Sequence, residues 1–431
     1  MVTQKTVGYY TLGCKLNYAE TDAIARTMET EGYARVKFSE VADYYVINTC
    51  SVTEAANKKS RYMIRKAYAR SPQATIIIVG CYAQLKPDEI QKIPGVSLVL
   101  GALDKFNIPD KIKEFEQLGS QTLISSCEIS QVSLFESSYS LEERTRSFLK
   151  VQDGCDYNCS YCTIPQARGK SRNATIAHCV SQAQEIAQAG VKEIVLTGIN
   201  IGDFGRTTGE TFLELLQQLD TVQGIERIRI SSIEPNLLSS EIIQFVAQSR
   251  VCMPHFHIPL QAGSNAVLAL MRRRYTTELF AHKINEILRY IPHAAIGVDV
   301  IVGTPGETDE LFEQSYQFLA SLPISYLHVF TYSERDNTDA LNIEPKVPTH
   351  IRHTRSIAMH ELSEQLHASY VARFSSTIRP VLFESKQKNG MFTGYTDTYI
   401  KVSARISEQY KNTIVPVFLD YTAHGMIGTI V

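Results

Sequence analysis

The stretch GCDYNCSYC, residues 154–162, places Cys155, Cys159 and Cys162 at spacings of four and three residues. The chain of 431 residues has nine cysteines, so chance explains this grouping poorly. Structural zinc takes four protein ligands, and no fourth Cys or His lies within reach of this short segment. Three thiolates on one loop are typical of a [4Fe–4S] cluster whose fourth iron has no protein ligand. The spacing therefore predicts a cluster with an open iron, which leaves room for a substrate or cofactor.

The cysteine loop follows the first of six strand-like segments that alternate with helical patterns. The strand-like segments are residues 146–152, 192–198, 227–233, 255–261, 296–303 and 326–333, and residues 173–190 and 307–322 are examples of the helical patterns. This alternation predicts a partial, open (β/α)6 barrel over residues 141–375. Such barrels carry chemistry at the carboxyl ends of their strands, which is where the three cysteines would lie.

Residues 1–138 form a separate series of apolar runs and helix-like segments. The apolar runs are residues 6–13, 43–49, 75–80 and 96–101, and together with the helical patterns they predict a doubly wound parallel sheet. Cys14, Cys50 and Cys81 each follow the end of one of these runs. Ligand residues of such sheets gather in the crevice beyond the carboxyl ends of the strands, so we expect a second cluster on these thiols. The alternative is three unrelated core cysteines.

Residues 376–431 have a different character, with short alternating segments broken by polar turns, which predicts a small antiparallel β-barrel. The whole chain has a formal net charge of −2, so nucleic-acid binding would depend on local basic patches. No apolar run approaches the ~20 residues of a membrane span, and the N-terminus lacks a signal pattern. We therefore expect a cytoplasmic protein with no membrane partner.

Nine cysteines in a reducing compartment favour metal or catalytic roles over a disulfide framework. Cys127 and Cys179 fit neither group of three, and we interpret them as packing residues. Cys252 lies near His255 and His257 in the sequence and could belong to a metal motif. A strand that enters the barrel explains this group without a metal.

The longer segment GCDYNCSYCTIPQARG, residues 154–169, resembles the CxxxCxxC loop of the radical S-adenosylmethionine (SAM) superfamily. VDVIVGTPGET (298–308) is similar to the late SAM-contacting strand of these enzymes. LTGIN (196–200), SSIEP (231–235), HIPLQAGS (257–264) and VFTYSERDNT (329–338) resemble motifs of the methylthiotransferase branch. The resemblance implies that SAM binds the open iron. The resemblance also implies contacts to SAM from five residues, by their positions within these motifs: Thr197, Asn200, Glu234, Gln261 and Val300.

Methylthiotransferases replace an inert C–H bond by C–S–CH3, and the resemblance implies the same chemistry here. Their N-terminal part holds an auxiliary [4Fe–4S] cluster on three cysteines, which match Cys14, Cys50 and Cys81. One SAM methylates sulfur at that cluster, and a second SAM at the Cys155, Cys159 and Cys162 cluster supplies a radical. Cofactors carry such chemistry because an unactivated C–H bond is beyond acid–base catalysis. The expected cofactors are thus two [4Fe–4S] clusters and SAM.

The branch modifies an adenosine beside the tRNA anticodon or an aspartate of a ribosomal protein. The C-terminal segment resembles the RNA-binding TRAM domain, and its basic residues are Lys386, Lys388, Lys401, Arg405 and Lys411. Further basic runs lie at residues 58–66 and 272–274, although each could be an ordinary solvated face. TLGCKLN (11–17) and ERTR (143–146) resemble the subfamily that acts on N6-threonylcarbamoyladenosine, whereas isopentenyladenosine enzymes usually have GCQMN. Asn337 departs from the usual Gly of the family.

These features predict methylthiolation of C2 of N6-threonylcarbamoyladenosine at position 37 of tRNA, giving 2-methylthio-N6-threonylcarbamoyladenosine. The alternatives are the same chemistry on isopentenyladenosine or on the ribosomal aspartate. An alternative of another class is a non-catalytic RNA-binding protein with zinc at the cysteine sites. The expected partners are the tRNA anticodon stem-loop and an electron donor such as flavodoxin or ferredoxin, and the enzyme is expected to be a monomer.

Overall fold

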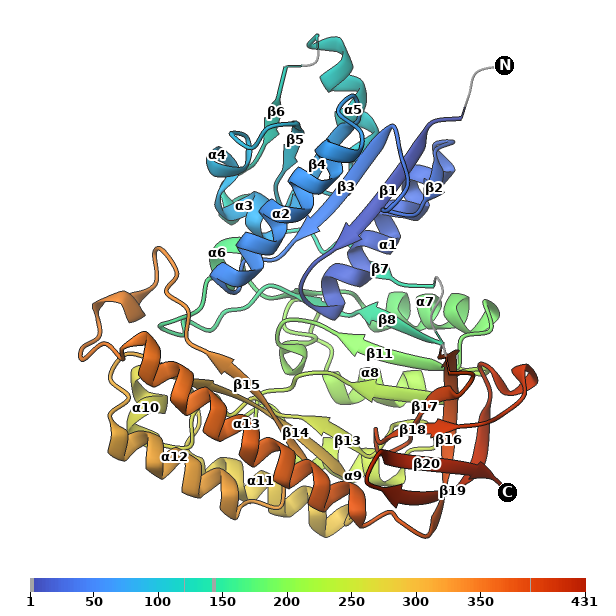
Figure 1. Cartoon of the computed structure of the whole chain (residues 1–431), viewed down its shortest axis with the longest axis vertical. Coiled ribbons are helices and arrows are strands. Elements are labelled where there is room, and N and C mark those ends of the chain that lie inside the picture. Colours follow the sequence, from blue (N-terminus) through green and yellow to red (C-terminus); the bar gives the residue numbers. More distant parts are fainter. Residues whose placement is uncertain (1–3, 120, 142–144, 388) are drawn as a thin grey trace.

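The computed structural model describes residues 4–119, 121–141, 145–387 and 389–431. It consists of an N-terminal sheet, a central set of parallel strands and a C-terminal barrel (Figure 1). This arrangement confirms the expected α/β fold class. No helix in the described ranges is both long and apolar enough to cross a membrane.

Six parallel strands form the N-terminal sheet, in the order β2-β1-β3-β4-β5-β6. They are β1 (Thr6–Thr11), β2 (Ala34–Val36), β3 (Tyr44–Thr49), β4 (Thr75–Gly80), β5 (Val96–Leu100) and β6 (Leu123–Ser125). Two helices pack on one face and three on the other: α1 (Lys15–Thr30) and α5 (Ile108–Gln117), then α2 (Glu54–Arg70), α3 (Cys81–Leu85) and α4 (Pro87–Ile90). The sheet is therefore doubly wound, and burial on both faces explains the continuous apolar run of β4.

The six expected strands of the central part are all present, and they form two sheets that each contain three parallel strands. They are β8 (Arg146–Lys150), β11 (Glu193–Thr197), β12 (Arg227–Ile230), β13 (His255–His257), β14 (Ala295–Val302) and β15 (Tyr326–Thr331). Single bridges at Ile228–Cys252 and Ser232–His257 join β12 to β13. The short β7 (Ser138–Tyr139) adds an antiparallel edge next to β8.

The main helices of the central part are α7 (Ile176–Gln188), α8 (Phe212–Asp220), α9 (Ser240–Gln248), α11 (Thr277–Tyr290), α12 (Asp309–Ser321) and α13 (Thr349–Ala372). Their buried apolar residues share one core with the strands, which contains Leu196, Ile228 and Val300. Cys179 and Cys252 belong to this core. Two shorter helices, α6 (Ile164–Arg168) and α10 (Asn265–Leu270), lie in loops.

The C-terminal barrel is closed, in the order β16-β17-β18-β20-β19. Its strands are β16 (Thr377–Lys386), β17 (Phe392–Thr396), β18 (Lys401–Ala404), β19 (Ile414–Thr422) and β20 (Gly425–Ile430). Four of the strand pairs are antiparallel, as expected, but β18 and β20 are parallel. The parallel pair arises because β20 returns antiparallel to β19 and closes the barrel against β18, a strand that is not its neighbour in the sequence.

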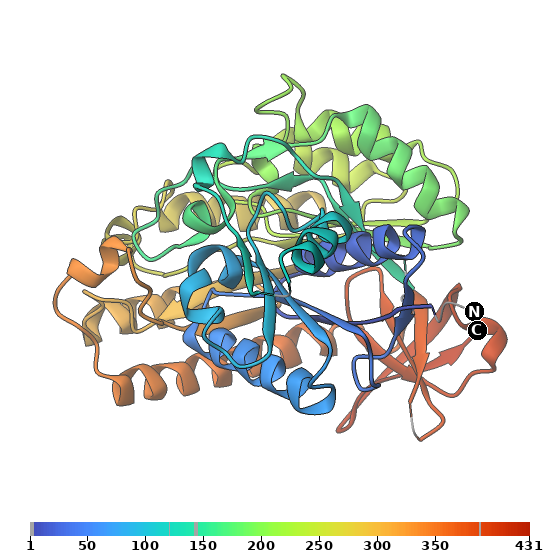
Figure 2. The same cartoon turned by 90° about the horizontal axis from the view of Figure 1, so that it is seen from above.

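The three parts pack against one another. The N-terminal part lies over the central strands, and the barrel packs at one side of them (Figures 1 and 2). Arg227 and Arg229 of β12 are buried and donate hydrogen bonds to backbone carbonyls of the barrel at Pro380, Tyr395, Thr396 and Asp397. Because these four hydrogen bonds are made by buried side chains, they fix the barrel relative to the strands.

Candidate active site

Cys155, Cys159 and Cys162 lie on the loop before α6 and line a cavity of about 300 Å³. The walls of this cavity come from the carboxyl ends of the central strands, where a βα architecture places its chemistry. Val52 and Thr53 of the N-terminal part also line it. The cavity is therefore shared between two parts of the chain, and its volume falls in the range of small-molecule sites.

Each thiol of this loop receives a hydrogen bond. Backbone N–H groups of Tyr157 and Ile164 donate to the Sγ atoms of Cys155 and Cys162, both at 3.4 Å. The guanidinium of Arg273 donates to Cys159 Sγ at 3.2 Å. Burial raises the pKa of Cys155 and of Cys162 to about 12, so a metal charge is needed to form these thiolates. Donors aimed at the sulfurs then stabilise the metal-bound form.

The other three cysteines lie at the carboxyl ends of three strands that are neighbours in the sheet. Cys50 and Cys81 directly follow β3 and β4, and Cys14 follows shortly after β1. Burial raises the pKa of Cys50 to about 12, and the nearby thiols of Cys81 and Cys14 contribute to the shift. A Cβ atom on Gly13 would lie 2.7 Å from Cys50 Cβ, and Gly13 has a φ of 94°. Glycine at this position therefore allows the β1 and β3 ends to approach closely, which brings the three cysteines toward one crevice.

Both groups of three cysteines are spread more widely than one metal ion requires. Among the described residues, only His257, Asp299 and His328 bring three such ligand atoms within 4.8 Å of one another. A tetrahedral zinc with bonds of about 2.3 Å would hold its sulfur ligands roughly 3.8 Å apart. Each group therefore fits a larger unit such as a [4Fe–4S] cluster better than a single zinc ion.

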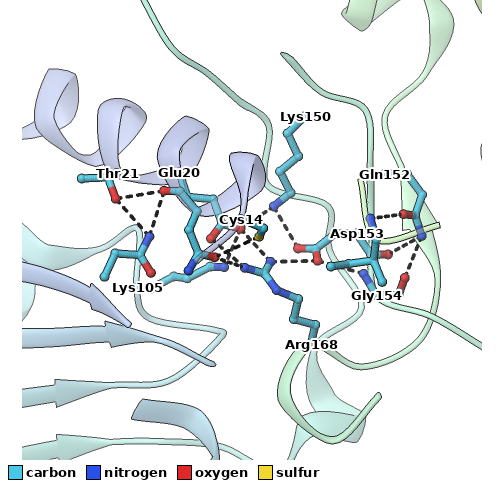
Figure 3. A network of polar contacts seen from close by, with 12 residues as sticks. Cys14, Glu20, Thr21, Lys105, Lys150, Gln152, Asp153, Gly154 and Arg168 are labelled. Atoms are coloured by element: carbon cyan, nitrogen blue, oxygen red, sulfur yellow. Dashed lines mark hydrogen bonds and ion pairs between the residues drawn. The ribbon is translucent and has the colours of Figure 1, made fainter. Parts of the chain in front are cut away.

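A buried network of charges joins the segment that follows Cys14 to the two segments that flank the 155–162 loop (Figure 3). Glu20 of α1 pairs with Lys105, Lys150 and Arg168, at 2.7, 3.0 and 3.0 Å. Asp153 pairs with Lys150, Arg168 and Arg172. Burial alone would raise the pKa of Glu20, but Arg168, Lys105 and Lys150 hold it well below its usual range.

Arg168 has a second role in this network. It donates to Asn17 and Glu20 of the N-terminal part although it belongs to α6, directly after the Cys162 loop. Burial raises the pKa of Cys14, and the positive charge of Arg168 is the largest influence that opposes this shift. The network contains four cations but only two carboxylates, Glu20 and Asp153, so it has an excess of positive charge. Thiolates at the neighbouring cysteines would balance this charge. The donor set thus fits an anionic cluster.

Three of the five expected SAM-contacting side chains line the cavity, namely Asn200, Glu234 and Gln261. The Oδ1 atom of Asn200 is buried without a hydrogen-bond partner among the described residues, which suits a polar ligand. Gln261 adopts a φ of 72°, held by backbone hydrogen bonds with Asp299 and Ile301 of β14. Strained backbone of this kind is often found at ligand sites.

The side chains of Thr197 and Val300 lie outside the lining of the cavity. Val300 is buried in the central core, because its neighbours Asp299 and Ile301 face the cavity and side chains alternate along a strand. Thr197 is also buried, and its Oγ1 has no hydrogen-bond partner in the described ranges. The contacts of both residues with SAM remain predictions.

Sequence reasoning missed several residues of the cavity. Arg273 was considered only as part of a surface basic run, yet it is buried and ion-paired with Glu234. Burial raises the pKa of Glu234, and the charge of Arg273 opposes this shift. Asp299 lies in the segment that resembles the SAM-contacting strand but was not singled out, and the only signal for Val52 and Thr53 is that they follow Cys50. The ERTR segment falls partly on residues 142–144, which lie outside the described residues, and so does Lys388.

Two sequence families match the chain. Residues 6–101 match the family described as uncharacterized protein family UPF0004, and residues 149–319 match the radical SAM superfamily. Among solved structures, radical SAM methyltransferase TsrM from Kitasatospora setae, with cobalamin and a [4Fe–4S] cluster bound, aligns with a TM-score of 0.56. It is 15% identical and covers 76% of this chain and 75% of that chain, so the likeness concerns the fold alone.

Curated relatives extend the match over nearly the whole chain. The threonylcarbamoyladenosine tRNA methylthiotransferase MtaB of Bacillus subtilis (strain 168) is 40% identical over 96% of this chain and 93% of its own. The protein of the same name from Aquifex aeolicus (strain VF5) is 39% identical over 83% and 88%. A tRNA-2-methylthio-N(6)-dimethylallyladenosine synthase from that organism is 30% identical, over 90% of each chain. The chain therefore belongs to the radical SAM tRNA methylthiotransferase family, whose radical SAM domain binds a [4Fe–4S] cluster and SAM.

Proposed function

We propose that this chain methylthiolates C2 of N6-threonylcarbamoyladenosine at position 37 of tRNA. The observation that carries the proposal is the shared cavity: one cysteine group lines it, and Val52 and Thr53, shortly after Cys50 of the other group, complete its wall. The relatives of highest identity among those described above are named for this reaction. When bound, two [4Fe–4S] clusters and SAM supply the methyl group, the sulfur site and the radical.

The residues of the chain bind and orient the reactants. Cys14, Cys50 and Cys81 hold the auxiliary cluster, and the loop cysteines 155, 159 and 162 hold the radical SAM cluster. Asn200, Glu234 and Gln261 line the cavity and offer polar groups to SAM. The N-terminal part contributes Val52 and Thr53 to the cavity wall, which reduces the access of water to the reacting atoms.

The C-terminal barrel supports an RNA substrate. Lys386, Lys401, Arg405 and Lys411 are all exposed on it, and their charges suit a phosphate backbone. A closed five-stranded barrel with one parallel pair is typical of oligonucleotide-binding barrels, to which a TRAM domain belongs. We further propose that the enzyme is a cytoplasmic monomer that receives electrons from a flavodoxin or ferredoxin and binds the anticodon stem-loop.

The decisive test is cluster analysis combined with two cysteine variants. The reconstituted protein should contain about eight iron and eight sulfide per chain, as two [4Fe–4S] clusters require. Cys159→Ala should abolish 5′-deoxyadenosine formation, whereas Cys50→Ala should retain it and lose methylthiolation. Cys127→Ala, which lies outside both groups, should behave as wild type.

Other outcomes separate the alternatives. One zinc per cysteine group without labile sulfide would support the non-catalytic RNA-binding alternative. Product formation by Cys50→Ala would contradict the assignment of the auxiliary cluster. Mass spectrometry of tRNA nucleosides, from cells that lack the protein, would show loss of the 2-methylthio form of threonylcarbamoyladenosine or of isopentenyladenosine. Loss of neither would shift the proposal to the ribosomal aspartate.

A further inference from the structure

Lys15 is a cation without a partner at the junction of the N-terminal and central parts. It is the first residue of α1 and directly follows Cys14. Its side chain is partly buried, and no hydrogen bond or ion pair joins its ammonium to any residue that the structure describes. Because a charge that is partly removed from water without a counter-charge is costly, an anion bound at this position would be stabilised.

The ammonium of Lys15 lies among side chains from the interior of the central strands. Its pKa is lowered by burial and then by the charges of Arg146 and Arg229, while Asp299 and Glu193 oppose the shift. The two arginines already have carboxylate partners: Arg229 pairs with Glu193 at 3.0 Å, and Arg146 pairs with Glu384. Lys15 is therefore the cation of this group that is left to bind an anion from outside the chain.

The side chains that surround the ammonium of Lys15 extend to the cavity that the cysteine loop lines. Asp299 lines the cavity, and its Oδ1 is 2.7 Å from Nε2 of His257. On β15, Phe330 lines the cavity, and His328 is two residues earlier on the same face, with its ring 5.1 Å from that of His257. A polar strip thus runs from the cavity toward Lys15.

The size of this strip matches a modified base. Two residues of a strand advance about 6.7 Å. In an extended N6-threonylcarbamoyl group, N6 and the carboxylate carbon are about 5 Å apart, by peptide bond lengths. An adenine in the cavity with C2 toward the clusters could therefore place its N6 substituent along the strip.

We propose that Lys15 is a specificity-determining residue, which binds the threonyl carboxylate of the substrate nucleoside. This inference rests on the proposed function. The imidazoles of His257 and His328 lie beside the path of the substituent and offer hydrogen bonds to its hydroxyl and urea groups. An isopentenyl group has no anion, and it would leave the buried ammonium unpaired. A site built to pair a polar group rejects an analogue that lacks it.

The same strip is poorly suited to a metal ion. His257, Asp299 and His328 offer ligand atoms within 4.8 Å of one another. The charge of Lys15 acts on this group, because burial, His257 and Lys15 all lower the pKa of His328. A neighbouring cation disfavours a divalent metal and favours an anionic ligand.

The test compares anticodon stem-loops that carry unmodified adenosine, threonylcarbamoyladenosine, its methyl ester or isopentenyladenosine at position 37. Binding to the cluster-loaded protein is measured by fluorescence anisotropy without reductant, and methylthiolation is measured separately. Wild type should bind the free acid roughly 10- to 100-fold more tightly than the methyl ester, as expected for a hydrogen bond to a charged group. This comparison needs no variant, so it holds even if substitution beside Cys14 impairs folding.

Lys15→Gln should bring the acid-to-ester ratio close to one, whereas Lys15→Arg should keep most of the preference. Lys92→Gln, an exposed lysine of the same part, is the matched control and should leave the ratio unchanged. Equal weakening of all four stem-loops by Lys15→Gln would indicate a phosphate contact and overturn the inference.

The two proposals fail in different ways. A wild type that methylthiolates threonylcarbamoyladenosine but binds acid and ester equally overturns the role of Lys15 alone. A wild type that modifies only isopentenyladenosine overturns the proposed substrate and the role of Lys15 together.

Discussion

Replacement of Glu20 by Gln tests whether the buried charge network holds the N-terminal and central parts together. Glu20 is fully buried and accepts charge-assisted hydrogen bonds from Lys105, Lys150 and Arg168. Lys150 and Arg168 keep Asp153 as a partner in the variant. Lys105 has no other carboxylate within 4 Å in the described chain, so the variant leaves a buried ammonium without a counter-charge.

The expected loss of stability follows from these contacts. Oε1 of Glu20 accepts from all three cations and Oε2 accepts a further bond from Arg168, so a Gln side chain loses the Oε2 acceptor and the negative charge that strengthens the others. The expected cost is the roughly 3–5 kcal/mol measured when one partner of a buried ion pair is removed. For an N-terminal part with a urea m-value near 3 kcal/mol/M, the midpoint should fall by about 1 to 1.7 M.

The assay is urea unfolding of the variant and of wild type, followed by circular dichroism, with the first transition taken if the parts unfold separately. Glu226→Gln is the matched control, because Glu226 pairs with Lys192 at 2.8 Å and its side chain is 45% exposed. Exposed pairs contribute about 0–1 kcal/mol. A Glu20→Gln midpoint within error of the Glu226→Gln midpoint would refute the reasoning.

The dependence on pH gives a second check. The folded-state pKa of Glu20 lies below the unfolded value of 4.5, so its contribution is present above pH 4.5 and is lost as the pH falls further. The difference in stability between wild type and Glu20→Gln should therefore be constant near neutral pH. It should shrink below pH 4.5, and a difference that grows on acidification would contradict the assigned role.

Two further predictions concern the cysteines and the barrel. Gly13→Ala should lower the iron content from about eight toward four per chain, because the new Cβ would meet Cys50. The control Gly32→Ala also has a positive φ, of 90°, but its new Cβ would meet no atom within 4 Å, so this variant should keep both clusters. Equal losses of iron in both variants would point to backbone strain alone. Affinity for tRNA should fall linearly with salt on logarithmic axes, and Lys401→Ala should reduce the slope by about one unit; an unchanged slope would exclude a phosphate contact at that residue.

Much of the fold could be predicted from local sequence patterns. Each expected central strand is present because its apolar run and flanking turns are local signals. The pairing of strands within the barrel was less predictable. The alternation of apolar and polar residues identifies β18 and β20 as strands, but it does not show that they pair in parallel. Register had a similar effect at the site, since a shift of one residue along β14 decides whether Val300 or Asp299 faces the cavity.

The charged contacts between the parts could not be predicted from spacing. Glu20 and Lys150 are separated by 130 residues, and Glu20 and Arg168 by 148. Nothing in the local sequence distinguishes these residues from ordinary surface charges, because burial arises only when two folded parts meet. Arg273 illustrates the same limit, since a run of three arginines looks like a solvated face until one of them is found beside Cys159.

Each group of cysteines has a cation close to it in the sequence that extends into the other part of the molecule. Lys15 follows Cys14 and extends from the N-terminal part into the interior of the central strands. Arg168 ends the short helix after Cys162 and extends the opposite way, toward Asn17 and Glu20. Each cysteine-bearing segment therefore sends a positive charge into the other part of the molecule. Because these contacts form only when the two parts are docked, they tie the docking of the N-terminal part to the shape of the cavity that both parts line.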